Sequence, residues 1–262
     1  MYGFPRRSTR QRRIIIKTPR EINIMMKAGE ISALALQHAS EMISPGVSTW
    51  DISRAIGDFI LRRGAKPSFK GLYDFPGNAC ISINAELIHG IPSKKRYLRE
   101  GDIISIDVGA CKDGYHGDNA ATFACGEIPV KTQRLMSVTE QALSEAIKQA
   151  YAGNRIGDIS NAIQTCCESN GYYVPEEYFG HGVGRELHED PNVPNHGDAG
   201  RGPRLTPGMT IAIEPMFNST TKKTKILSDE WTVVEGNMNP SAHFEHTVLI
   251  TNNEPIIMTK LS

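Results

Sequence analysis

Residues 98–118 read LREGDIISIDVGACKDGYHGD, and residues 205–216 read LTPGMTIAIEPM. An offset of 107 residues superimposes the leucine, the glycine and the isoleucines of these stretches, and it carries Asp107 onto Glu214. The same offset aligns an upstream helical pattern, in which Gly46, Asp51-Ile52-Ser53, Ala55-Ile56 and Gly64 match Gly153, Asp158-Ile159-Ser160, Ala162-Ile163 and Gly171. One offset that holds over a helix and then a strand predicts a single domain built from two related halves. A functional site is expected between them, with one acidic residue from each half.

The first of these stretches is predicted to form a β-hairpin, because Asp113-Gly114 suits a two-residue primed turn. With that turn, Gly109 lies opposite Asp118. Asp107 then lies diagonally across from Asp118 on the same face, roughly 7–8 Å away at Cα. Two carboxylates on a face flanked by Ile, Val and Gly repel each other unless a cation lies between them. A pair of solvent-facing aspartates is the alternative, and the hairpin alone does not exclude it.

Helical and strand patterns recur in the same order in both halves. Thr18-Pro19-Arg20-Glu21 is typical of a capping box with proline at the first helical position, and the apolar stripe after it predicts a helix that stops at Pro45-Gly46. A second helix is predicted from Ser48 or Thr49 to Gly64, with counterparts of the two helices at about 131–152 and 157–170. Strands are predicted at about 78–92, 102–125, 209–217 and 241–251. The expected fold class is α+β.

The composition is that of a single enzyme-sized domain. The chain has 262 residues, of which 39% are hydrophobic and 22% charged. Its apolar runs are all too short to span a bilayer, and Ile14-Ile15-Ile16 is too short for the apolar core of a signal peptide. We therefore expect a cytoplasmic protein without a membrane partner. Five cysteines without Cys-x-x-Cys spacing indicate reduced thiols rather than disulfides or a thiolate zinc site.

The N-terminal stretch is strongly basic, although the net charge of the chain is zero. Residues 1–20 hold seven of the 29 basic residues and no acidic one. Residues 1–17 are therefore expected to form a flexible arm before a single catalytic domain, residues 18–262. Such an arm is either a solvated tail or a contact to a polyanion such as ribosomal RNA. The tail is favoured, because no aromatic or Gly-rich RNA-binding pattern accompanies the arginines.

The second half places further metal-type ligands in apolar surroundings. Glycines surround His181 in the stretch FGHGVGRELHE, residues 179–189, and Glu214 and Glu245 each stand in an apolar strand pattern. A buried acid needs a cation or a hydrogen-bond network. The helical zincin motif His-Glu-x-x-His is excluded, because after His188-Glu189 it requires a histidine at position 192, where this chain has Asn192. Each of these residues taken singly is more often structural. Five of them together in a domain with two related halves predict a dinuclear metal site; they are Asp107, Asp118, His181, Glu214 and Glu245.

From about residue 18 onward the chain closely resembles the methionine aminopeptidases of type I, the bacterial form, which have the pita-bread fold. The motifs that carry the resemblance are Ser82-Ile83-Asn84, His89-Gly90-Ile91-Pro92, Asp107 with Asp118, Gly180-His181-Gly182-Val183-Gly184, Ile213-Glu214-Pro215-Met216 and Glu245-His246-Thr247. The resemblance implies an internally duplicated domain with pseudo-two-fold symmetry. It also implies a monomeric enzyme that removes the N-terminal methionine from nascent polypeptides whose second residue is small.

The resemblance also assigns roles to individual residues. It implies metal ligation by Asp107, Asp118, His181, Glu214 and Glu245, with Asp118 and Glu245 bridging. Four carboxylates and one imidazole suit two divalent Mn, Fe, Co or Zn ions, which hold a bridging water for attack on the scissile carbonyl. In the mechanism of the family, Glu214 carries the proton, His188 steadies the oxyanion and His89 contacts the scissile amide.

The methionine pocket is where the resemblance weakens. Its walls, by position, are Phe69, Leu72, Phe75, Cys80, Leu187 and Trp231. Members of the family commonly have tyrosines near the first of these positions, and His243 stands where glutamine is frequent. The pocket is expected to remain apolar and to accept methionine, while for Leu72 and Phe75 an ordinary core role is equally compatible with the sequence.

Two other functions fit parts of the pattern. A Xaa-Pro aminopeptidase or prolidase shares the fold and all five ligands, but such enzymes normally carry a sizeable domain before the catalytic one, and about seventeen residues precede the first predicted helix here. A non-catalytic pita-bread binding protein is the other alternative. Such proteins usually lose metal ligands, and none of the five is missing.

Overall fold

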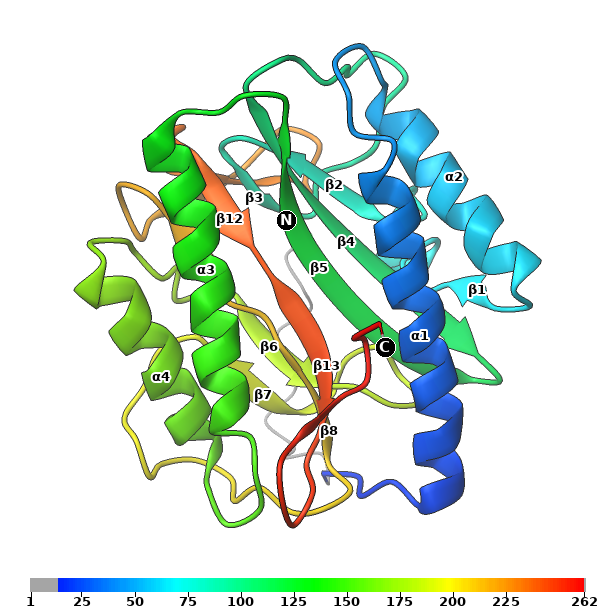
Figure 1. Ribbon diagram of the computed structural model, residues 1–262, viewed down its shortest axis with the longest axis vertical. Helices are drawn as coiled ribbons and strands as arrows, with labels where there is room; N and C mark the ends of the chain where they lie inside the picture. Colours follow the sequence, from blue (N-terminus) through cyan, green and yellow to red (C-terminus); the bar gives the residue numbers. More distant parts are fainter. Residues whose placement is uncertain (1–13, 262) are drawn as a thin grey trace.

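The computed structural model describes residues 14–261, which form a large antiparallel sheet with helices packed against it (Figure 1). Residues 1–13, most of the predicted basic arm, lie outside the described residues. The helices are α1 (Pro19–Ser40), α2 (Thr49–Arg62), α3 (Val130–Lys148) and α4 (Ile156–Ser169), with a short 3-10 turn, η1, at Leu72–Asp74. The strands are β1 (Lys66–Pro67), β2 (Cys80–Ile83), β3 (Glu86–Ile88), β4 (Asp102–Lys112), β5 (Tyr115–Cys125), β6 (Phe179–Gly182), β7 (Glu189–Pro194), β8 (Thr210–Ile213), β9 (Met216–Asn218), β10 (Thr224–Ile226), β11 (Val233–Glu235), β12 (Ser241–His243), β13 (Glu245–Leu249) and β14 (Ile256–Ile257).

The sheet reflects the internal duplication of the sequence. Its central order is β4-β5-β13-β8, so each half supplies a pair of strands and the halves meet between β5 and β13. Asp107 lies on β4, and Glu214 follows β8, the counterpart of β4 in the second half. The predicted α+β pita-bread fold with pseudo-two-fold symmetry is therefore confirmed.

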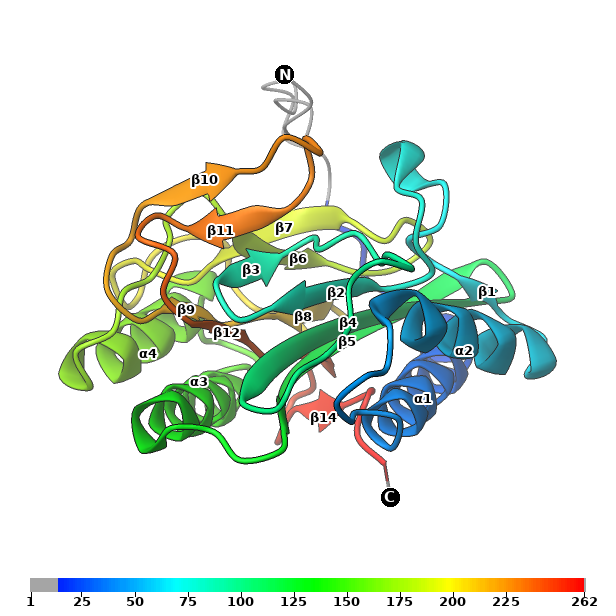
Figure 2. The ribbon, with the colours of Figure 1, turned by 90° about the horizontal axis from the view of Figure 1, so that it is seen from above.

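The four helices of the described chain lie on one face of the sheet (Figure 2). α1 packs on β4 and β5 with α2 beside it, and α3 packs on β8 and β13 with α4 beside it. Each helix pair buries its own apolar cluster against its half of the sheet. Burial of this apolar surface stabilises each half and leaves the opposite face of the sheet for the site. β3, β10 and β11 form a small separate sheet beyond that opposite face (Figure 2).

The starts of α1 and α2 follow the predicted capping signals, and the predicted ends of α2 and α4 lie within two residues of the observed ends. The predicted ends of α1 and α3 lie several residues too late. Thr18 and Glu21 form the capping box of α1, and Ser48, rather than Thr49, caps α2 by accepting a hydrogen bond from Asp51 N (3.1 Å). α1 ends at Ser40 instead of reaching Pro45-Gly46. Pro45 disfavours helical dihedrals at the preceding residue, so the chain leaves the helix earlier through tight turns.

The predicted arm boundary at residue 17 falls after the ordered chain has begun. Lys17 is 5% exposed, donates from its backbone N to Gly208 O (2.8 Å) and pairs with Glu189 through its side chain. Ile14 packs against the core cluster under α3 and α4. At least the end of the basic stretch is therefore fixed to the domain.

The cysteines and the helices of the described residues bear on two further expectations, reduced thiols and the lack of a membrane span. The five cysteines all lie within the described residues and are unpaired, as predicted. Among residues 14–261, none of the helices has both the length and the apolar character that a membrane crossing requires.

Candidate metal centre

A cavity of about 840 Å³ opens on the sheet face away from the helices, between the two halves. All five predicted metal ligands lie on its wall, as do the predicted catalytic histidines His89 and His188. The wall comprises carboxylates and histidines on one part and aromatic side chains on another. Strands far apart in the sequence thus bring together every residue predicted to act in the chemistry.

The hairpin places its two aspartates as predicted. Gly109 pairs with Asp118 across β4 and β5, so Asp107, which pairs with Ala120, is the diagonal neighbour of Asp118. On the other side of β5, Ala120 pairs with Glu245 of β13. Asp107, Ala120 and Glu245 therefore form one row across three strands, and the small alanine leaves space between the two flanking carboxylates.

His181 completes the most compact part of the site. Ligand atoms of Asp118, His181 and Glu245 all lie within 4.8 Å of one another. The Nε2 atom of His181 is 3.9 Å from Asp118 Oδ2 and 3.6 Å from Glu214 Oε1. The neighbours of His181 must be glycines here, since a Cβ on Gly180 or Gly182 would lie 2.3 Å from a backbone carbonyl oxygen.

The electrostatics of the cluster call for bound cations. Burial, and secondarily the neighbouring carboxylates, raise the pKa values of Asp107, Asp118 and Glu245 well above their ordinary range. One oxygen of each of these three carboxylates is buried without a hydrogen-bond partner. Oxygen atoms so placed, beside one imidazole, fit divalent ions such as Mn, Fe, Co or Zn. The described side chains therefore suit the metals that the sequence predicts.

Cys80 also touches the cluster, because it pairs with Asp107 across β2 and β4. Burial, followed by the charges of the nearby carboxylates, raises the pKa of its thiol well above the ordinary value. A thiol that keeps its proton is a poor metal ligand. The position of Cys80 thus agrees with its predicted place in the pocket wall rather than with ligation.

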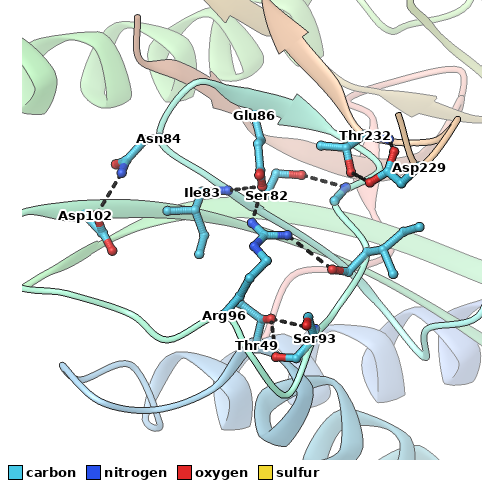
Figure 3. Close-up of polar contacts among 12 residues, drawn as sticks. Thr49, Ser82, Ile83, Asn84, Glu86, Ser93, Arg96, Asp102, Asp229 and Thr232 are labelled. Carbon is cyan, nitrogen blue, oxygen red and sulfur yellow. Dashed lines mark hydrogen bonds and ion pairs between the residues drawn. The ribbon is translucent and has the colours of Figure 1, made fainter. Parts of the chain in front are cut away.

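His89 lies on a loop whose next two residues, Gly90 and Ile91, are hydrogen-bonded to Ser82 and Arg96, two of the residues labelled in Figure 3. Its φ of +60° is unusual for a residue with a side chain, and two anchors fix the backbone next to it: Gly90 N donates to Ser82 Oγ (3.1 Å), and Ile81 N donates to Gly90 O (2.8 Å). Arg96, which is ion-paired with Glu86, donates to Ile91 O (3.2 Å). Burial lowers the pKa of His89 to about 4, so the ring is neutral at pH 7.

His188 approaches the centre from the turn before β7. Its ring lies 4.4 Å from the ring of His181, between centroids, and nearly perpendicular to it at 84°. On its other side the ring of Tyr73 is nearly parallel, with centroids 6.3 Å apart. Both predicted catalytic histidines therefore lie on the cavity wall, on separate loops.

The predicted methionine-pocket residues form one apolar cluster. Phe69, Phe75, Cys80 and Leu187 are buried together, with Leu72 and Trp231 packed against them. Phe75 and Trp231 meet edge to face at 5.1 Å between ring centroids. Leu187 belongs to this cluster but is not part of the cavity wall, unlike the other five. An apolar recess thus adjoins the carboxylates.

Comparison with known proteins agrees with this geometry. The model of metallopeptidase family M24 matches residues 23–252. Methionine aminopeptidase 1 of Bacillus subtilis is 48% identical over 248 residues, which cover 95% of this chain and 100% of the relative. The chain belongs to the methionine aminopeptidases of metallopeptidase family M24.

Solved structures separate this family from its relatives of the same fold. The crystal structure of methionine aminopeptidase from Thermotoga maritima matches with a TM-score of 0.94 and 44% identity, over 95% of this chain and 100% of that chain. Prolidase from Pyrococcus furiosus matches with a TM-score of 0.77 and 27% identity, over 95% of this chain but 66% of the prolidase. The prolidase alternative is therefore the less supported one.

Several wall residues of this methionine aminopeptidase site were not predicted from the sequence. They are Tyr73, Ile88, Glu177, Tyr178, Phe179, Glu186, Asn192 and Met216. Glu177, Tyr178 and Phe179 directly precede the Gly180-His181 motif, so their place in the sequence was an available signal. Tyr73 carried none, because its exposure on the cavity wall depends on left-handed backbone at residues 73 and 74.

Two buried residues support Glu214 from behind. Asn195 Nδ2 donates to the backbone O of Glu214 (2.9 Å). His243 on β12 is 1% exposed, and its Nε2 lies 3.4 Å from Glu214 Oε2 without hydrogen-bond geometry. Asn195 thus holds the backbone of Glu214, the residue implied to carry the proton, and His243 lies beside its carboxylate.

Proposed function

We propose that this protein removes the N-terminal methionine from nascent polypeptides whose second residue is small. The observation that carries the proposal is the adjacency of two features in one cavity: a cluster of buried carboxylates around His181 and an apolar recess beside it. The recess suits a flexible apolar side chain such as methionine. The high identity to curated methionine aminopeptidases over nearly the whole chain supports the same activity.

Asp107, Asp118, His181, Glu214 and Glu245 would hold two divalent ions. When bound, such ions activate water and polarise the scissile carbonyl. Glu214 would accept the proton of the attacking water and return it to the leaving amine. The neutral ring of His89 would contact the scissile amide, and His188 would donate to the oxygen that becomes negative.

Substrate choice provides the test of this function. Purified protein is expected to hydrolyse a Met-Ala-Ser peptide and to leave intact a Xaa-Pro peptide whose first residue is charged, because the apolar recess beside the carboxylates suits a methionine side chain and not a charged one. Release of free methionine, measured by chromatography, checks the result. Cleavage of the Xaa-Pro peptide alone would favour the prolidase alternative, and cleavage of neither in metal-loaded protein would favour a binding protein.

We further propose that the protein acts in the cytoplasm as a monomer and that its basic arm is a solvated tail. Deletion of residues 1–13 is expected to leave hydrolysis of a short peptide nearly unchanged, since every proposed catalytic residue lies beyond residue 80. If the arm binds ribosomal RNA instead, the deletion will weaken co-sedimentation with ribosomes at low salt, and added salt will weaken it for the intact chain. Equal co-sedimentation of both forms at every salt concentration supports the tail.

A further inference from the structure

A buried ion pair joins the N-terminal segment to the turn that carries His188. Lys17 Nζ lies 2.7 Å from Glu189 Oε2, and the two side chains are 2% and 6% exposed. The partners are 172 residues apart in sequence. Taking two charges out of water is costly, and replacing such a pair by apolar residues often leaves stability unchanged or improves it. Its presence directly after His188, which lines the cavity, therefore points to a role other than stability.

The lysine end of the pair is firmly placed. Lys17 N donates to Gly208 O (2.8 Å), and Lys17 Nζ also donates to Ile15 O (3.3 Å). Gly208 precedes β8, whose end carries Glu214. The ammonium group is thus fixed to the sheet rather than to a mobile tail.

The glutamate end of the pair organises the turn from Gly184 to His188. Glu189 Oε1 accepts a hydrogen bond from Glu186 N (3.2 Å). The carboxylate lies so close to Gly184 that a Cβ added there would come within 2.3 Å of Oε1. Gly184 O in turn accepts from His116 N (2.9 Å), which ties the turn to β5. One carboxylate oxygen of Glu189 thus contacts Lys17, and the other accepts a hydrogen bond from the turn. Through these two contacts Glu189 fixes the turn, and with it His188, relative to the sheet.

We propose that Lys17 is a positioning residue for His188, acting through Glu189; this rests on the proposed function. Without the ammonium group, the buried carboxylate would lose its charged partner and would move toward water or other donors, releasing Glu186 N. The turn that sets the distance between the His188 and His181 rings would then loosen. The metal-type ligands would be unaffected, because none of them lies on this turn.

The test is a double-mutant cycle on the full-length, metal-loaded protein with a Met-Ala-Ser substrate. Lys17→Met is expected to lower kcat about 10- to 100-fold, the range expected when a catalytic group is misplaced by about 1 Å. Metal content should stay at the wild-type value. In a His188→Ala background the same substitution should change kcat less than about twofold, since there is no longer a ring to position. Lys17→Arg should restore part of the loss, and Lys27→Met, an exposed lysine on α1, should leave kcat unchanged.

Hydrogen exchange gives a readout that does not depend on activity. The amide of Glu186 should exchange faster in Lys17→Met than in wild type, and at the wild-type rate in Lys27→Met. An equal fold-loss of kcat from Lys17→Met with and without His188, or unchanged exchange at Glu186, would overturn the proposal. If Lys17→Met does not fold, Lys17→Gln, a neutral side chain that can still donate a hydrogen bond to Glu189, replaces it, with the same direction of change expected in kcat and in the exchange of the Glu186 amide. Wild-type activity on the Met peptide is measured first, so a failure of the proposed function is recognised separately.

Discussion

Chelation of the protein is expected to abolish hydrolysis of a Met-Ala-Ser peptide, and addition of Co(II), Mn(II) or Fe(II) is expected to restore it. The reason lies in the buried carboxylates, three of which have an oxygen without a hydrogen-bond partner. Without cations these groups take up protons, and a protonated cluster neither activates water nor polarises a carbonyl. Metal analysis beside the peptide assay checks the result. Full activity in protein shown to be metal-free would contradict the dinuclear centre.

The same chelated protein should show a defined dependence of stability on pH. Asp107, Asp118 and Glu245 have folded-state pKa values raised above their unfolded values, mainly by burial. The folded metal-free protein therefore binds more protons than the unfolded chain, and its stability falls as pH rises from the ordinary carboxyl range of about 4 through the raised pKa values. The thermal midpoint of the metal-free form should therefore drop as the pH rises above the ordinary carboxyl range. Metal should raise that midpoint more at the higher pH, where ligation displaces fewer protons. A midpoint that rises with pH in the metal-free form would show that the cluster does not govern it.

The parts of the fold that the sequence predicted correctly rest on local chemistry. The Asp113-Gly114 turn set the register of β4 and β5, and that register alone fixed the diagonal relation of Asp107 and Asp118. The capping box at Thr18 set the start of α1. The offset that relates Asp107 to Glu214 predicted that the two halves share one site, because equivalent strands in a symmetric sheet approach a common interface.

The parts that escaped prediction depend on contacts between distant segments. The short strands β10 and β11 have no strong alternation; β11 is held by pairing with β3, and β10 by pairing with β11. The pairing of Lys17 with Glu189 follows from the path of the chain beside Gly208, just before β8, and the charge of Lys17 instead suggested a flexible arm. Tyr73 reaches the cavity because Tyr73 and Asp74 have positive φ angles, which the preferences of these residue types do not predict. Local pattern thus predicted which carboxylates and which histidine lie together on the cavity wall, whereas the contacts that support them needed the tertiary structure.

Glu214→Gln and His89→Ala are expected to lower kcat for different reasons. Glu214 is proposed both to hold metal and to carry the proton, so its amide replacement should collapse kcat by about 10²- to 10⁴-fold, the range for a lost general acid–base group, and should also reduce bound metal. His89 lies on the cavity wall on a loop held by Ser82 and Arg96, with a pKa of about 4. Its loss should slow turnover by about 10²-fold or more while the metals stay bound.

Metal content measured beside the kinetics separates the two variants. His89 is a suitable test of the division between ligand and non-ligand histidines, because it lines the same cavity as His181 but is not part of the group of ligand atoms around Asp118 and Glu245. A His89→Ala protein that retains metal but turns over slowly has lost a contact to the substrate. A His89→Ala protein that has lost its metal would mean that His89 contributes to the metal centre, and the proposed ligand set of four carboxylates and His181 would then be wrong.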